Sequence, residues 1–120
     1  MKTLKRILIV AASLLMLVSC AEEGIYPRKS RGTVRIVSYN VGVFGKFDLS
    51  SEKYTAGLMN ELQADVIALQ ELDSCTTRSG VERFQPEVFA GEMGEQWDYT
   101  YAAALKSYKE GSYGIGQVWN

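Results

Sequence analysis

The chain has 120 residues and a formal net charge of −1, with 47% hydrophobic and 11% aromatic residues. This length is enough for one small domain, and the apolar content argues against an intrinsically disordered chain. Without the three cations of the first 20 residues (Lys2, Lys5 and Arg6), the remainder carries about −4. A surface of that charge gives no strong case for non-specific nucleic-acid binding, which needs a basic face.

Residues 1–20 have the features of a bacterial lipoprotein signal peptide. The basic residues precede the apolar run Ile7–Val18, which is too short to span a bilayer comfortably. The run ends in Leu17-Val18-Ser19-Cys20, which resembles the box in which a cysteine is lipidated and becomes the new N-terminus. We therefore expect an exported protein, anchored to the cell envelope and specifically to the outer membrane by lipid on Cys20. The alternatives are a plain secretory signal and a buried helix with an incidental cysteine.

A polar segment, residues 21–32, follows the expected lipidation site. It contains Gly24, Pro27 and Gly32, as in a solvated tether, so the domain itself is expected over residues 33–120. If Cys20 carries lipid, Cys75 has no partner in the chain, and we expect no disulfide.

The first half of the domain predicts a strand, a helix and a second strand. Alternation of apolar residues predicts a strand over 33–39, followed by a glycine-containing loop. A helix is expected from about Ser50 to about Gln63, with Tyr54, Leu58 and Leu62 as its buried stripe and Met59 beside them. Residues 65–72 form a near-continuous apolar run, which is typical of a strand covered on both faces.

The second half predicts a short helix and a hairpin. After a polar loop over 73–85, a helix begins near Pro86, turns Val88 and Phe89 inward and stops at Gly94. Strands are expected over 97–105, with Tyr99, Tyr101 and Ala103 on one face, and over 113–118, with a loop over 106–112 between them. Such a strand pair leaves an open edge and an uncovered face, so we expect an incomplete domain.

Each of the first two predicted strands ends in a polar side chain that an apolar strand does not need. These are Asn40 in the first and Gln70-Glu71 in the second. The two segments resemble the first two motifs of the endonuclease/exonuclease/phosphatase superfamily, the deoxyribonuclease-I-like metal-dependent phosphohydrolases. The resemblance rests on Ser38-Tyr39-Asn40 and on Asp65-Val66-Ile67-Ala68-Leu69-Gln70-Glu71.

The resemblance implies an α/β fold, the N-terminal part of a four-layered α-β-β-α sandwich with two packed mixed β-sheets flanked by helices. It implies hydrolysis of a phosphoester that depends on Mg²⁺, with Mn²⁺ as a possible substitute. Glu71 would be the metal ligand, and Asn40 the neighbouring amide that orients the metal shell or the phosphate; both are implied to be catalytic. One carboxylate suffices because magnesium keeps several waters. The alternatives are a solvated carboxylate for Glu71 and turn chemistry for Asn40.

The loop after Glu71 and the glycines near the end of the chain are weaker candidates. Thr76, Thr77 and Arg78 are candidates for contact with a substrate phosphate, since a guanidinium suits a bidentate contact; the alternative is a solvated polar loop. The glycine pattern over 111–116 is too weak to indicate a phosphate cradle, and we expect structural reasons for it.

The later motifs of the superfamily supply histidines and an Asp-x-Asn segment; the chain contains neither a histidine nor such a segment. The resemblance covers residues 33 to about 118, so we expect the 120-residue chain alone to be inactive. The alternative function is a catalytically inactive lipoprotein fragment or binding module. Within the superfamily the substrate stays open among nucleic acid, sphingolipid, inositol phosphate and sugar phosphate, and the acidic charge favours a small phosphoester.

Overall fold

The computed structural model of the chain describes residues 25–46 and 51–120. The expected signal peptide with Cys20, the start of the tether and Ser50 lie outside the described residues, so the expectations for them stay predictions.

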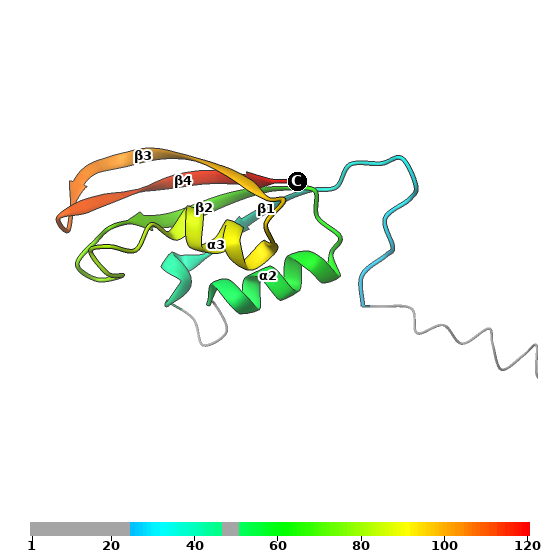
Figure 1. Cartoon of the computed structure of the whole chain (residues 1–120), viewed down its shortest axis with the longest axis horizontal. Helices are drawn as coiled ribbons and strands as arrows, with labels where there is room; N and C mark the ends of the chain where they lie inside the picture. The colour runs from blue at the N-terminus through cyan, green and yellow to red at the C-terminus, as the bar shows by residue number, and fades with distance from the viewer. Residues whose placement is uncertain (1–24, 47–50) are drawn as a thin grey trace, which may run out of the picture.

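The described elements follow the predicted α/β order. In the sheet, β1 is parallel to β2, and β4 is antiparallel to both β2 and β3, so the strand order is β1-β2-β4-β3. Figure 1 shows this sheet with the helices beneath it. The elements are β1 (Ile36–Asn40), the 3-10 helix η1 (Gly42–Phe44), α2 (Glu52–Glu61), β2 (Val66–Ser74), α3 (Gln85–Met93), β3 (Asp98–Tyr108) and β4 (Gly111–Trp119).

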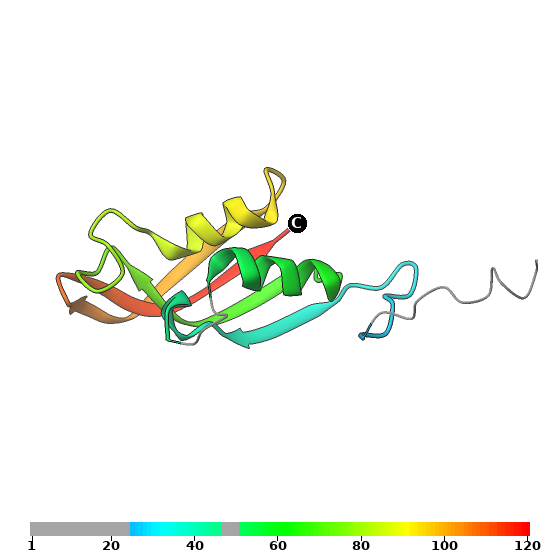
Figure 2. The ribbon, with the colours of Figure 1, turned by 90° about the horizontal axis from the view of Figure 1, so that it is seen from below.

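The core lies between the sheet and the two α-helices, which cover the same face of the sheet (Figures 1 and 2). From the strands it takes Ile67, Leu69, Leu72 and Val118, and from the helices residues such as Met59 and Phe89, all fully or almost fully buried. Tyr99 and Tyr101, which the sequence predicts to share one face of their strand, both pack against this cluster.

Among the described residues, no helix covers the opposite face of the sheet. Ile36 on β1 and Ile115 on β4 are 70% and 53% exposed. Val66 and Ala68 on β2 are only half-buried, so the expectation that this strand is covered on both faces is wrong for the described residues. The uncovered face agrees with the expectation drawn from the strand pattern.

Helix α2 buries a different stripe from the predicted one. Tyr54 is 62% exposed, and Leu58 and Leu62 are half-buried. The fully buried positions are shifted by about one residue because Ala56 and Thr55 are small enough to let α2 approach α3 closely. Ser51 is the N-cap and accepts a hydrogen bond from Tyr54 N at 3.3 Å. The buried residues of α2 are Glu52, Thr55, Ala56 and Met59.

Helix α3 matches its prediction. Pro86 lies in its first turn, Phe89 is fully buried, Val88 is half-buried and Gly94 is the C-cap. The proline fits because the first turn of a helix has no intrahelical partner for its N–H.

The β3–β4 hairpin is longer and its loop shorter than predicted. Strand β3 continues to Tyr108 through two register shifts, and Lys109 and Glu110, with φ of 48° and 66°, make the turn. The expected loop over 106–112 is therefore wrong, because bulges keep the strands paired through polar residues. The glycines have the expected structural reason: a Cβ on Gly114 would lie 2.1 Å from the Ala102 carbonyl oxygen.

Candidate functional site

Parallel pairing of β1 and β2 brings the two predicted site residues together. Asn40 is the register partner of Gln70, and Glu71 follows at once. The Asn40 Nδ2 donates a hydrogen bond of 2.9 Å to Glu71 Oε1. The carboxyl ends of parallel strands meet at one edge of a sheet, which is why motifs far apart in sequence meet here.

Glu71 occupies a β-bulge. Gln70 pairs with Ile115 and Leu72 with Gly114, so Glu71 has no partner on β4, and its φ is 60°. A bulge of this kind re-aims a side chain, and a non-glycine residue at positive φ is uncommon. Because the bulge absorbs one residue, Leu72 returns to the buried face while the Glu71 side chain stays 29% exposed at the sheet edge.

The Glu71 carboxylate is held in its ionised form. The hydrogen bond from Asn40 lowers its pKa below the usual value, against the opposing effect of burial, and Lys46 contributes in the same direction. The Lys46 Nζ lies 3.4 Å from Glu71 Oε2. Glu71 therefore offers a negative charge at neutral pH.

The loop after β1 fixes the orientation of the Asn40 amide. Its Oδ1 accepts a hydrogen bond of 3.0 Å from Gly42 N, which leaves Nδ2 facing Glu71. Asn40 therefore has both of the roles considered for it. Its Oδ1 stabilises the turn after β1, and its Nδ2 donates to Glu71. Val43 in this loop has φ 53° and ψ 25°, a conformation that is costly for a β-branched side chain.

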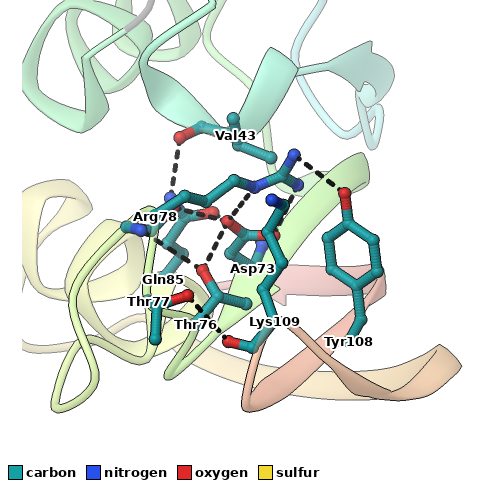
Figure 3. Close-up of polar contacts among 9 residues, drawn as sticks. Val43, Asp73, Thr76, Thr77, Arg78, Gln85, Tyr108 and Lys109 are labelled. Carbon is teal, nitrogen blue, oxygen red and sulfur yellow. Dashed lines mark hydrogen bonds and ion pairs between the residues drawn. The ribbon is translucent and has the colours of Figure 1, made fainter.

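Asp73 organises the loop that follows β2 (Figure 3). It is fully buried, and its carboxylate accepts hydrogen bonds from Arg78 Nε and Nη2, both at 2.7 Å, from Thr76 Oγ1 at 2.8 Å and from the Ser79 hydroxyl. Burial alone would raise the pKa of Asp73, but the donors from Arg78, Ser79 and Thr76 outweigh it and lower the pKa. The sequence interpretation missed this residue; the arginine five positions later in the same loop was its one sequence signal.

Arg78 is fixed against two aromatic rings. Its Cζ lies 5.1 Å from the ring centroid of Tyr108 and 5.4 Å from that of Tyr113, and Nη1 is 3.4 Å from the Tyr108 hydroxyl. Its side chain is 33% exposed. Asp73 raises the pKa of Arg78, so the guanidinium stays charged.

The other polar residues singled out in the sequence serve the loop and the strands. Thr76 is buried against Asp73, and Thr77 Oγ1 donates a hydrogen bond to the Lys109 carbonyl at 3.2 Å. Thr76 is thus unavailable to a ligand. Gln70 Nε2 donates to Ser38 Oγ on the neighbouring strand. Cys75, the cysteine within the described residues, is free and half-buried.

A pocket of about 550 Å³ lies between Glu71 and the β3–β4 hairpin, with Arg78 in its wall. It combines a carboxylate, two cations and a wall of apolar and phenolic groups. A second pocket of about 500 Å³ adjoins it and shares Val43, Gly45 and Arg78. The first is lined by Val43, Gly45, Lys46, Glu71, Arg78, Leu105, Tyr108 and Tyr113.

Mg²⁺ needs only one or two protein carboxylates and keeps several waters. Glu71 is the acidic side chain that lines the first pocket, and its two oxygens lie 2.9 Å from Asn40 Nδ2 and 3.4 Å from Lys46 Nζ. Asp73 is not available, since its oxygens already accept four hydrogen bonds from side chains. Among residues 25–46 and 51–120, no group of three or more His, Cys, Asp or Glu side chains is placed to hold a metal. In the same residues no helix is both long and apolar enough to cross a membrane.

No family model matches the chain, and no curated protein matches it. Among solved structures, the chain is similar to an endonuclease/exonuclease/phosphatase family protein from Leptotrichia buccalis C-1013-b, with a TM-score of 0.57 and 15% sequence identity. The likeness covers 72% of this chain and 38% of that chain. At this identity the likeness shows the fold. The predicted fold class is therefore confirmed, and the chain spans well under half the length of that protein.

Proposed function

We propose that residues 33–120 are the N-terminal part of a metal-dependent hydrolase of phosphoester bonds. The observation that carries the proposal is the contact between Asn40 and Glu71, at 2.9 Å, at the edge of a pocket that also holds the Arg78 guanidinium. The resemblance of both strand-end motifs to those of the superfamily, and the fold likeness to one of its proteins, support the same function.

In this proposal each side chain has a separate task. Glu71, ionised at neutral pH, holds Mg²⁺ or Mn²⁺, and Asn40 fixes its carboxylate by donating to Oε1. A bound divalent ion would neutralise charge on the phosphate and lower the pKa of a water. Arg78 is a substrate-binding residue: two of its N–H donors go to Asp73 and a third points to the Tyr108 hydroxyl, so two of the five remain for a phosphate oxygen.

The whole protein would be exported and anchored in the envelope by lipid on Cys20, acting on a phosphoester outside the cytoplasm. The second candidate is a non-catalytic binding module. It is favoured by the single carboxylate of the site and by the exposed apolar side chains of Ile36 and Ile115 on the sheet.

Because the 120 residues alone are expected to be inactive, the test is hydrolysis of bis-p-nitrophenyl phosphate by a domain completed with the later motifs of the superfamily, with Mg²⁺ and after chelation. Glu71→Gln keeps the side chain's shape and removes its charge, so we expect a loss of at least about 10²-fold, as for removal of a dominant electrostatic group. Glu61→Gln, on the exposed end of α2, is the matched control and should not change the rate. Turnover in Glu71→Gln with the magnesium dependence of the wild type would refute the assignment.

A further inference from the structure

Gln85, the first residue of α3, connects the two segments that carry Asn40 and Glu71. Its side chain is 1% exposed. The Oε1 accepts a hydrogen bond of 2.7 Å from Asp73 N, and the Nε2 donates one of 2.7 Å to the Val43 carbonyl (Figure 3). Both ends of one buried carboxamide are thus bound to main-chain groups, on β2 and in the loop after β1.

The bond to Asp73 lies just past the bulge. Strand β1 ends at Asn40 opposite Gln70, so within the described residues β1 supplies no partner at Asp73. The Gln85 oxygen supplies the acceptor that this backbone N–H needs, since a buried donor without a partner is destabilising. Gln85 thereby holds β2 two residues after Glu71.

The bond to Val43 acts on the other segment. Val43 has a left-handed conformation that its branched side chain disfavours. Donation from Gln85 Nε2 to its carbonyl fixes the peptide in this orientation. The same turn presents Gly42 N to Asn40 Oδ1 at 3.0 Å, and that bond turns Asn40 Nδ2 toward Glu71.

Together these contacts close a ring that runs from Glu71 to Asn40, through Gly42 and Val43 to Gln85, and back along β2 from Asp73. We propose that Gln85 is a positioning residue, which sets the Asn40–Glu71 contact by fixing the loop after β1 against the bulged end of β2. As a statement about metal binding, it rests on the function proposed above.

The structure separates this role from the packing of α3. The helix is anchored by Phe89, Ala90 and Met93, which are 0%, 3% and 6% exposed, independently of Gln85. A variant that loosens this anchoring should lower the melting temperature without altering the ring. A variant of Gln85 should alter the ring even in a chain that stays folded.

Two substitutions distinguish the two hydrogen bonds of the Gln85 carboxamide. Gln85→Glu keeps an acceptor for Asp73 N, but an ionised carboxylate cannot donate to the Val43 carbonyl and repels it. Gln85→Met has a similar length and forms neither bond. Met93→Ala is the matched control, since it weakens α3 from a position that faces the core.

The experiment uses the full chain, with ¹⁵N-labelled NMR spectra and titration with Mn²⁺ alone as the probe. For Gln85→Glu and Gln85→Met we expect the Asn40 side-chain NH₂ signals to move to their position in Glu71→Gln, and the Mn²⁺ dissociation constant to rise at least fivefold. The exchange of the Asp73 amide should accelerate only in Gln85→Met. Met93→Ala should change none of the three.

A reversal provides a further test. Because glycine adopts positive φ without strain, Val43→Gly in the Gln85→Met background should return the Asn40 signals toward wild type.

The proposal is overturned if folded Gln85→Met keeps the wild-type Asn40 signals, or if Met93→Ala shifts them equally. If both Gln85 variants fail to fold, the wild-type chain decides: rapid exchange of Asp73 N–H would overturn the proposal, and protection would support it. If the wild type binds no Mn²⁺, the proposed function fails, while the Asn40 signals still decide the role of Gln85.

Discussion

Removal of the Asp73 carboxylate should cost the chain a large part of its stability. Asp73→Ala removes the fully buried acidic partner of the Asp73–Arg78 ion pair, and breaking a buried pair typically costs about 3–5 kcal/mol. Arg78 is 33% exposed and regains water, which reduces that figure, whereas Thr76 is buried and loses its acceptor at about 1–3 kcal/mol. We expect a net loss of about 3–4 kcal/mol, against the ~5–15 kcal/mol total that is usual for a domain.

The assay is urea denaturation followed by circular dichroism, for Asp73→Ala, Arg78→Ala and the double variant. Residues in direct contact should show a coupling energy of at least about 1 kcal/mol in this cycle. A coupling near zero would refute the account of the loop, because it would mean that Asp73 and Arg78 contribute independently.

The pH dependence of stability gives an independent test, because it should have opposite signs in the wild type and in Arg78→Ala. In the wild type the pKa of Asp73 is lowered on folding, so its contribution is fully present above the unfolded value of about 3.9 and is lost as pH falls through the folded pKa. In Arg78→Ala burial should dominate and raise this pKa, so stability should increase as pH falls toward it. Equal pH slopes in the two proteins would contradict the assignment.

Three further predictions follow from the sequence and fold. Cys20→Ala should move the protein from the detergent to the aqueous phase in phase partitioning; equal partitioning of both forms would remove the case for lipidation. Ile36→Lys should raise solubility, measured by light scattering, with little change in the melting temperature, because Ile36 is 70% exposed; a large loss of stability would show that this face is covered. Gly114→Ala should prevent stable pairing of β3 and β4, since its Cβ would lie 2.1 Å from the Ala102 carbonyl oxygen; an unchanged melt would contradict the strand register.

The succession of helices and strands along the chain, and the position of Asn40 and Glu71 at strand ends, could be predicted because both depend on local patterns. Alternating or continuous apolar runs mark strands, and polar side chains at the ends of two such runs meet when the strands are parallel neighbours. The same patterns placed Phe89 in the core and the end of α3 at Gly94.

Other features depend on contacts between distant segments, which residue patterns do not encode. The bulge at Glu71 arises because Leu69 and Leu72 are both buried against the helices, and a regular strand cannot place residues three apart on one face. The buried stripe of α2 is set by the approach of α3, which selects Ala56 over Tyr54. The sequence places Gln85 at the end of a polar loop. It gives no sign of the two hydrogen bonds, because both partners of Gln85 lie on other elements.

The central claim, that Glu71 is the residue that holds a divalent ion, is tested most directly by Mn²⁺ binding to the full chain. Electron paramagnetic resonance counts the free ion, and competition with Mg²⁺ checks that the same site is occupied. The account predicts one site in the wild type and in the Glu61→Gln control, and at least ~10-fold weaker binding in Glu71→Gln, the lower end of the loss found when a metal site loses a supporting group. Equal Mn²⁺ affinity in the wild type and Glu71→Gln would contradict it.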